Sequence, residues 1–300
     1  MGYLEERANL AGKVAAVVGG AAGVGAAATM ALAKAGVDIA FCDINADAVP
    51  ETRSAVEALG RRVTGHITDA WDLEQLGSFF DSIKSDFGHL DILVNVVGGS
   101  TRGSFADAPF EQWTTDIHRN LVWAMHSMSL AIPLIRAGGR GGSIISFTTI
   151  EAHRGAASYA PYAGAKAGLV NFSRSLAVEL GSEKIRVNLV APDATPSARI
   201  AKQMTPEVLR SIGATPEMMA RAFATYVPMG APPPVEDLGD AVLILASDLS
   251  SSITGTTLHV DGGTWASSGF LRWPDRADHT RHGGWGPTPP PWLLTEPASD

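Results

Sequence analysis

Cysteine is nearly absent from this 300-residue chain, in which Cys42 is the only one. A single thiol excludes an internal disulfide, and a reducing, cytoplasmic setting is the simplest expectation. Basic residues are also in deficit, because 23 Lys and Arg stand against 31 Asp and Glu, for a formal net charge of -8. That balance argues against a nucleic-acid-binding surface, which usually needs a basic stripe.

Targeting and membrane segments are missing from the pattern as well. The N-terminal residues contain no basic stretch followed by an apolar one, so no signal peptide is predicted. No uninterrupted apolar run is long enough to span a bilayer, so no membrane association is expected. Hydrophobic residues make up 45% of the chain, which allows a sizeable globular core.

Apolar strand-like runs alternate with helix-like segments along most of the chain. This pattern predicts an α/β fold with a doubly wound parallel sheet, whose ligand sites lie at the carboxyl ends of the strands. The runs are nearly continuous in apolar residues, as expected for strands buried on both faces. The predicted strands lie near 13–18, 37–42, 62–67, 91–96, 142–148, 185–191 and 256–260, and the helices near 24–35, 46–59, 72–87, 110–137, 159–181 and 235–247.

Glycines follow the first predicted strand at positions 19, 23 and 25, directly before an alanine-rich helix. Glycines allow close approach of a ligand, and the free N–H groups of a helix start attract phosphate. Asp43 stands 18 residues past Gly25, at the end of the second strand, where a dinucleotide fold places an acid for the adenosine ribose. Loop, helix and acid together predict a nicotinamide or flavin dinucleotide site.

A Tyr-x-x-x-Lys pair, Tyr162 and Lys166, lies at the start of a predicted helix. A spacing of four places both side chains on one helix face. A nearby ammonium favours the phenolate, so we expect Lys166 to lower the pKa of Tyr162 and make it a usable general acid/base. Taken alone, such a pair is common by chance and is usually a surface pair.

Over about residues 10–263 the chain resembles the classical short-chain dehydrogenase/reductase family. The matching residues are Gly19-x-x-x-Gly23-x-Gly25, Asp43, Asn95-Val-Val-Gly98, Asn120, Thr149, Tyr162-x-x-x-Lys166, Ile185-Arg-Val-Asn188 and His259-Val-Asp-Gly-Gly263. The resemblance implies a single Rossmann domain with a seven-stranded parallel sheet in the order 3-2-1-4-5-6-7. It also implies a homotetramer or homodimer, with the helices near 110–137 and 159–181 at the main interface.

The resemblance further implies an NAD-dependent oxidoreductase that interconverts a secondary alcohol and a ketone. Tyr162 would exchange a proton with the substrate oxygen, Thr149 would position that oxygen, and Lys166 would hold the nicotinamide ribose. Asn120 would hold a water of a proton relay; the alternative is a buried asparagine satisfied by backbone groups. The implied cofactor-binding residues are Gly19, Gly23, Val24, Gly25, Asp43, Ile44, His66, Ile67, Asn95, Val97, Gly98, Tyr162, Lys166, Pro192 and Thr195.

Several positions depart from the family pattern. Thr149 stands where serine is usual; it keeps a hydroxyl but adds a methyl group. Thr148 should point to the opposite face of the strand. The other departures are Val18 for threonine, His66 for an adenine-facing aspartate, Val96 and Val97 for Asn-Ala, and Asp193 for glycine.

Asp43 also bears on the choice of cofactor. A carboxylate accepts hydrogen bonds from ribose hydroxyls and repels a 2′-phosphate. No Lys or Arg lies at 18–26 or at 44–45 to bind that phosphate, so NAD is expected rather than NADP. No metal is expected: His279 and His282 have no third ligand at a metal-binding spacing.

Two segments break the alternation of strands and helices. Residues 193–234 contain four methionines and are predicted to form a substrate lid, although an ordinary helical pair with methionine filler fits as well. Residues 264–300 hold four tryptophans among many prolines, too many prolines for a helix or a strand ladder. We expect this tail to pack on its own subunit or a neighbour; a partly disordered end is the alternative.

The substrate is constrained only loosely. The methionines and tryptophans favour a bulky apolar alcohol or ketone, such as a steroid, terpenoid or aromatic compound. A 3-oxoacyl thioester on an acidic carrier is the alternative, suited by Arg199, Lys202, Arg210 and Arg221. A non-catalytic dinucleotide-binding sensor or scaffold is the alternative of another class. Glu151, His153 and Arg154 either line the substrate mouth or belong to a solvated loop.

Overall fold

The computed structural model describes residues 2–195, 205–211, 214–273 and 284–288. They fall into two compact units. The first lies within residues 1–192 and 235–258, and the second within residues 193–234 and 259–300. Arg199, Lys202, His279, His282 and Trp292, which the sequence interpretation singled out, lie outside the described residues.

A seven-stranded sheet in the order β3-β2-β1-β4-β5-β6-β7 is the framework of the fold. Its neighbouring strands from β3 to β6 pair in parallel, which confirms the predicted doubly wound Rossmann fold. The central strands β1 and β4 are buried along their whole length, because helices cover both faces. The strands are β1 Val14–Val18, β2 Asp38–Asp43, β3 Val63–Ile67, β4 Ile92–Asn95, β5 Gly142–Phe147, β6 Ile185–Pro192 and β7 Thr257–Val260.

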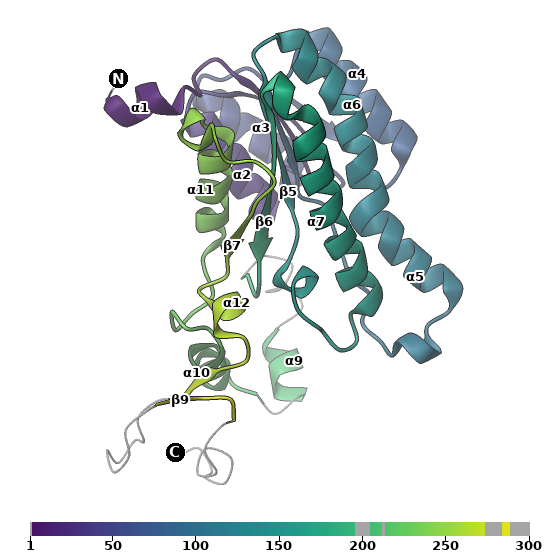
Figure 1. The fold of residues 1–300 in the computed structure, drawn as a ribbon, viewed down its shortest axis with the longest axis vertical. Helices are drawn as coiled ribbons and strands as arrows, with labels where there is room; N and C mark the ends of the chain where they lie inside the picture. Colours follow the sequence, from purple (N-terminus) through teal and green to yellow (C-terminus); the bar gives the residue numbers. More distant parts are fainter. Residues whose placement is uncertain (1, 196–204, 212–213, 274–283, 289–300) are drawn as a thin grey trace. The chain divides into compact units, whose positions relative to one another are not determined.

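Helices flank the sheet on both faces (Figure 1). One face carries α2 Gly23–Lys34, α3 Ala48–Ala58 and α11 Val235–Ala246, and the other carries α4 Leu73–Asp86, α5 Phe110–Ile117, α6 Trp123–Gly138 and α7 Ala160–Leu180. A short helix, α1 Tyr3–Ala8, precedes β1. Single 3₁₀ turns lie at Phe105–Asp107, Ile150–Ala152, Gly181–Glu183 and Asp248–Ser250.

The segment predicted as one helix over 110–137 is interrupted. A π-helical turn, His118–Val122, separates α5 from α6, and the buried Asn120 lies within it. Such π-bulges often mark functional sites. By length and hydropathy Phe110–Gly138 could also cross a membrane, but Trp123 and Met128 within it are core residues that pack against the sheet side of the fold.

The second unit contains short helices and a small hairpin: α9 Pro206–Ser211, α10 Pro216–Tyr226, α12 Thr264–Ser267, and the antiparallel strands β8 Leu271–Trp273 and β9 Gly284–Gly286. The hairpin corrects the prediction that the tail forms no strand ladder. Trp273 lies against Gly284 and Gly286, where a Cβ in place of the glycine hydrogen would come within 3.0 Å and 2.5 Å of the indole. The pairing is possible because the paired residues include no proline.

Candidate active site

The glycine loop after β1 is shaped by very close backbone contacts. Gly19 has φ +87°, and the N–H groups of Gly19 and Gly20 donate to the Cys42 carbonyl at 2.8 Å and 3.0 Å. A Cβ on Gly25 would lie 1.7 Å from the Gly19 carbonyl oxygen, so no side chain fits there. The N-cap of α2, Ala22, makes no side-chain capping bond, so the helix start keeps N–H groups for an anion.

Asp43 lies at the end of β2 beside this loop. Its Oδ2 accepts the Ala21 N–H and its Oδ1 accepts the Asn45 N–H, each at 3.0 Å. Each oxygen keeps a further lone pair, so the carboxylate can still accept hydroxyl donors of a ribose. Ile44 and Ile67, at the ends of the paired strands β2 and β3, are 65% and 62% exposed and offer apolar surface for a base.

The His66 side chain turns toward α4. Its Nε2 lies 2.9 Å from the Thr64 hydroxyl and 3.1 Å from the Ser82 hydroxyl. The ring also packs edge-on against Phe79, with centroids 5.8 Å apart. The imidazole edge that carries Nε2 is therefore already engaged by the protein. The resemblance to the family placed His66 where an aspartate faces the adenine, and it did not predict this contact with α4.

Residues 95–98 connect the glycine loop to the predicted catalytic residues. The Asn95 amide bonds Ser127 at 2.7 Å and Ser146 at 3.3 Å within the core, so contact with a cofactor would fall to its backbone. Val97 covers the loop, because a Cβ on Gly19 would lie 2.7 Å from its Cγ2. A Cβ on Gly98 would lie 3.0 Å from Asn120 Oδ1 and 3.1 Å from Lys166 Nζ. The two polar groups therefore converge on Gly98.

Tyr162 and Thr149 meet at the start of α7. Thr149 follows β5 and lies close enough to Tyr162 to affect its pKa, whereas the Thr148 hydroxyl donates to the Lys166 carbonyl at 3.4 Å. Burial raises the pKa of Tyr162 to about 12, and the Glu151 charge adds to this, while the nearby Thr149 hydroxyl lowers the pKa. Lys166, which the spacing predicted would lower this pKa, is not among the groups that shift it.

Lys166 is 3% exposed and donates from Nζ to the Phe147 carbonyl at 2.9 Å. Burial lowers its pKa from 10.5 to about 8, because an ammonium is poorly solvated there. The helical spacing does bring Tyr162 and Lys166 to one site. Because that pKa is close to mildly alkaline pH, Lys166 can exchange protons under such conditions.

Asn120 is fully buried, and its side chain is bound by backbone groups. Its Nδ2 donates to the Gly99 and Asp116 carbonyls at 2.6 Å and 2.8 Å, and its Oδ1 accepts the Gly99 N–H at 3.2 Å. The side chain thus joins the π-helical turn to the loop that follows β4. Both Nδ2 protons are used, so a water at Asn120 could be held only by an oxygen, either the second lone pair of Oδ1 or the backbone carbonyl.

The remaining predicted residues lie at the ends of elements. Val24, in the first turn of α2, and Gly23, with φ +53°, belong to the glycine loop. Pro192 ends β6 in the first unit, and Thr195 belongs to the second, where its hydroxyl donates to the Asp193 carbonyl at 3.3 Å. The Tyr226 hydroxyl donates to Asp193 Oδ2 at 2.6 Å, which gives the unusual aspartate a partner within its own unit.

Glu151 is the site residue that the sequence interpretation left undecided. Its carboxylate accepts hydrogen bonds from the Thr149 hydroxyl and, at 2.9 Å, from Arg154 Nη2. Its position two residues after Thr149 was the available signal, but only the 3₁₀ turn Ile150–Ala152 brings its side chain back to the hydroxyl. Within the described part of the chain, no group of three or more His, Cys, Asp or Glu is arranged to hold a metal ion.

Comparison with known proteins identifies the family. A family model described as enoyl-(acyl carrier protein) reductase matches residues 19–264. Trans-4-hydroxycyclohexanecarboxylate dehydrogenase of Sinomonas cyclohexanicum is 32% identical over 266 residues, which cover 87% of this chain and 95% of that protein. The 3-oxoacyl-(acyl-carrier-protein) reductase FabG of Haemophilus influenzae is 35% identical, over 85% of this chain and 99% of that protein. The chain belongs to the classical short-chain dehydrogenase/reductase family, and it is an oxidoreductase of that family.

Solved structures agree with this assignment. Carveol dehydrogenase from Mycobacterium avium, in complex with NAD, has a TM-score of 0.78 and 31% identity, covering 85% of this chain and 98% of that one. A 7α-hydroxysteroid dehydrogenase, in complex with NADH and 7-oxo glycochenodeoxycholic acid, has a TM-score of 0.77 and 28% identity, covering 88% and 98%. These likenesses support a nicotinamide dinucleotide as the cofactor, and the open start of α2 and the free lone pairs of Asp43 fit such a group.

Proposed function

We propose that the protein is an NAD-dependent oxidoreductase that interconverts a secondary alcohol and a ketone. The observation that carries the proposal is the convergence of Tyr162, Thr149 and Lys166 near Gly98. The neighbouring Val97 in turn contacts the glycine loop after β1. A nicotinamide dinucleotide bound at that loop would supply or accept the hydride. The Tyr162 hydroxyl would give a proton to a carbonyl oxygen or take one from an alcohol.

Lys166 and Asn120 would serve the proton exchange. The Lys166 ammonium, with its lowered pKa, would bind the nicotinamide ribose and favour the Tyr162 phenolate once the site is filled. Because the Asn120 side chain is bound by the backbone, we propose that a relay water is held by its backbone carbonyl. The π-helical turn supports this role, since it displaces the usual carbonyl partners of a helix.

NAD is proposed over NADP because Asp43 faces the glycine loop with free lone pairs. A 2′-phosphate next to this carboxylate would be repelled, and no Lys or Arg lies at 18–26 or 44–45 to offset the repulsion. Structural neighbours with bound NAD and NADH are consistent with that choice.

A bulky apolar substrate is proposed, with residues 193–234 as its lid. The names of the structural neighbours, a carveol dehydrogenase and a hydroxysteroid dehydrogenase, support an apolar ring compound. Met218 and Met229 are exposed in the second unit and offer adaptable apolar surface. A 3-oxoacyl thioester is the second candidate, favoured by the likeness to the FabG reductase.

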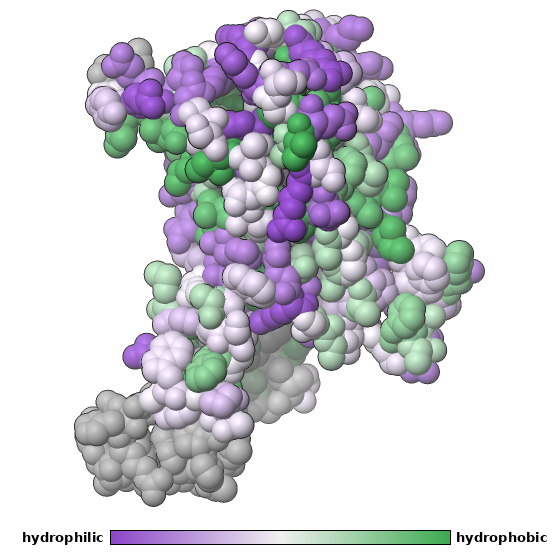
Figure 2. All heavy atoms as spheres, viewed as in Figure 1, coloured by the Kyte–Doolittle hydropathy of each residue, from purple (hydrophilic) through white to green (hydrophobic). Residues whose placement is uncertain are grey.

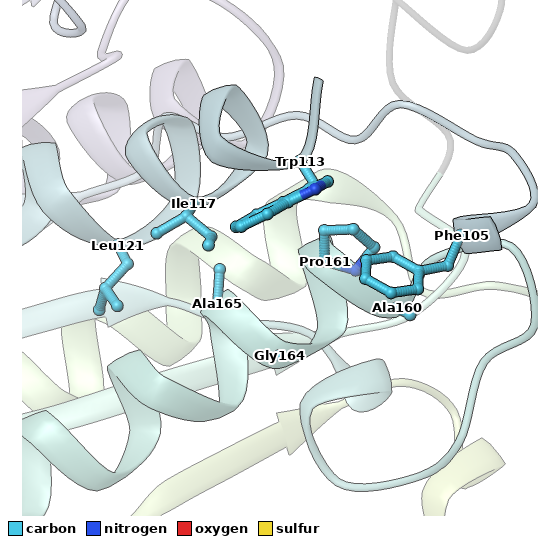
Figure 3. Close-up of a pocket in the computed structure, with 8 residues that line it drawn as sticks. All are labelled: Phe105, Trp113, Ile117, Leu121, Ala160, Pro161, Gly164 and Ala165. Carbon is cyan, nitrogen blue, oxygen red and sulfur yellow. The ribbon is translucent and has the colours of Figure 1, made fainter. Parts of the chain in front are cut away.

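Self-association is proposed for the face formed by α5, α6 and α7. A cavity of about 380 Å³ opens there, lined by Trp113 and Leu121 on one side and by Pro161 and Ala165 of α7 on the other (Figure 3). Helical periodicity puts this cavity on the face of α7 away from Tyr162 and Lys166, so it is separate from the catalytic residues. Figure 2 shows hydrophobic residues along α7 and α6. A homodimer or homotetramer would cover these residues. Separately, we propose a reducing, cytoplasmic location, because the chain has a single cysteine.

The test is reduced-nicotinamide absorbance during incubation with NAD or NADP and a panel of secondary alcohols at mildly alkaline pH. The panel spans steroid, terpene, aromatic and 3-hydroxyacyl compounds. Turnover with NAD on bulky apolar alcohols, lost in Tyr162→Phe while NADH binding persists, is the expected result. Turnover only with NADP would refute the role of Asp43, and turnover that persists in Tyr162→Phe would refute the mechanism. NADH binding without turnover on any compound would favour the sensor function.

A further inference from the structure

A polar cavity of about 460 Å³ lies at the amino ends of the sheet strands, within the first unit. We call it the basal cavity. It is lined by Lys13 before β1, Asp91 before β4, and residues within 140–143, 181–186 and 246–254, which lead into β5, into β6 and away from α11. The glycine loop and Thr149 follow the carboxyl ends of β1 and β5. Because β1, β4 and β5 are parallel, the basal cavity and the proposed active site lie at opposite edges of the sheet.

The basal cavity carries an excess of positive charge. The charged residues that line it are four cations and two carboxylates: Lys13, Arg140, Lys184 and Arg186, and Asp91 and Asp248. Two positive charges are therefore in excess, in a chain whose formal net charge is -8. The local charge is opposite in sign to that of the whole protein, and a cleft with such an excess concentrates ions of the other sign.

The two carboxylates of the basal cavity already have cationic partners. Asp91 is buried, and both of its oxygens accept from Arg140 Nη2 at 2.9 Å. Asp248 accepts from Lys13 Nζ at 3.0 Å. Each carboxylate thus balances one cation, and the excess charge belongs to Lys184 and Arg186.

Arg186 is held in place without a bond to a carboxylate. It is partly buried, and it donates from Nη1 to the Ser250 hydroxyl at 2.8 Å and from Nη2 to the Ser247 carbonyl at 3.2 Å. Both acceptors are neutral, and Asp248, whose charge attracts the guanidinium, already pairs with Lys13. A guanidinium has five N–H donors, so donors of Arg186 remain for a ligand.

Lys184 brings a second cation to the same cavity. Its ammonium has no hydrogen-bond or ion-pair partner among the described residues. The residue follows the 3₁₀ turn Gly181–Glu183 with φ +57°, a left-handed conformation that favours glycine or asparagine. Neither the backbone conformation nor a contact within the described chain accounts for a lysine at this position.

Hydroxyl groups complete the lining of the basal cavity. Thr254 Oγ1 accepts the Val187 N–H at 3.0 Å, which leaves its own proton to donate to a ligand. Ser251 and Ser252 add two further hydroxyls. The volume of the cavity falls in the range of small-molecule sites, about 300–1,000 Å³. Cationic and hydroxyl donors around one cavity form a donor set that suits the oxygens of a phosphate group.

We propose that the basal cavity binds a small anion with a terminal phosphate group, held by Lys184 and Arg186. A phosphate monoester carries about 1.5 to 2 negative charges at pH 7, which matches the excess of two positive charges. The guanidinium can bind two phosphate oxygens, and the ammonium adds a point charge. The inference does not rest on the proposed function, because the cavity shares no residue with the predicted cofactor-binding or catalytic set.

Isothermal titration calorimetry at constant ionic strength tests the proposal with inorganic phosphate, glucose 6-phosphate and glucose as probes. Each probe is titrated with and without excess NADH, because a phosphate could also bind at the start of α2. We expect saturable binding of the phosphate compounds, unaffected by NADH, and no binding of glucose. The tighter of the two phosphate compounds shows whether the site takes free phosphate or an organic phosphate.

Lys184→Gln identifies the site of binding. It removes the ammonium, and it should weaken phosphate binding at least about tenfold, because a charge-assisted hydrogen bond is lost. Glutamine, like lysine, is unbranched at Cβ, so the cost of the left-handed backbone should stay similar. Lys184→Glu should abolish binding. Arg53→Gln is the matched control, since Arg53 is an exposed cation on α3 that does not line the cavity.

Binding that is lost in Lys184→Gln and kept in Arg53→Gln would support the proposal, even if the protein oxidises no alcohol in the panel. The proposal would be overturned if neither phosphate compound bound saturably, if Lys184→Gln bound as tightly as the wild type, or if both variants lost affinity equally. Competition by NADH would place the phosphate at the glycine loop and would overturn it as well. Thermal unfolding of each variant without ligand, at the midpoint of the wild type, excludes misfolding as the cause.

Discussion

Replacing Lys166 by Met should remove one component of the pH dependence of stability. Burial lowers the pKa of Lys166 from 10.5 to about 8 in the folded protein. Between these two values the unfolded chain holds a proton that the folded chain has lost. The free energy of unfolding of the wild type therefore rises with pH across this window, because the unfolded state binds more protons.

The size of the effect follows from the shift. The difference between 10.5 and about 8 is about 2.5 units, and each unit corresponds to about 1.4 kcal/mol, for about 3 kcal/mol in all. Below pH 8 the fold bears this full cost of burying an ammonium, and above pH 10.5 it bears none. Lys166→Met has no such group, so its curve lacks this rise.

The assay is urea unfolding of wild type and Lys166→Met at several values between about pH 7.5 and pH 10.5. The quantity compared is the difference in unfolding free energy at each pH. Loss of the bond from Lys166 to the Phe147 carbonyl shifts that difference by a constant and leaves its slope unchanged. We expect the difference to rise by up to about 3 kcal/mol in favour of the wild type. If the unfolding free energies of wild type and Lys166→Met changed with pH in parallel, a buried, titrating Lys166 would be refuted. Lys84→Met, at the exposed end of α4, is the control, and its pH dependence should be parallel to that of the wild type.

Three further predictions concern the glycine loop, the cofactor and the core. Gly25→Ala should lower stability by about 2 kcal/mol in thermal unfolding and weaken NADH binding at least about tenfold, because the new Cβ overlaps the Gly19 carbonyl. Gly77→Ala is the control: it has open space around it in α4 and should stabilise the protein by about 0.5–1 kcal/mol. Asp43→Ser should raise the Kd for NADH and lower that for NADPH; equal changes in fluorescence titrations would count against the ribose role. Asn95→Ala should cost about 1–3 kcal/mol in urea unfolding, since buried hydroxyl partners lose their bonds.

Much of the fold was predictable because its determinants are local. Continuous apolar runs and helical periodicity predicted every strand of the large sheet within one or two residues. The glycines at 19 and 25 predicted a tight turn, and the structure confirms that the turn leaves no room for a Cβ at Gly25. The four-residue spacing predicted that Tyr162 and Lys166 share a helix face.

The interruption of the 110–137 helix was not predictable by the same means. Its apolar periodicity is continuous, and the π-helical turn depends on bonds from Asn120 to Gly99, a residue far away along the chain. The β8–β9 hairpin was missed for a related reason. Proline content discouraged a ladder, but the paired residues Leu271–Trp273 and Gly284–Gly286 lie outside the proline cluster.

The sequence by itself determined the order of the elements and the family, and it supplied the candidate reacting groups, because spacing along a helix or strand fixes which residues share a face. Only the tertiary structure decided the protonation and orientation of those groups. Burial lowers the pKa of Lys166, the Ser82 hydroxyl engages His66, and Glu151 takes the proton of Thr149. These outcomes depend on solvent exclusion and on neighbours brought together by packing, which no local pattern specifies.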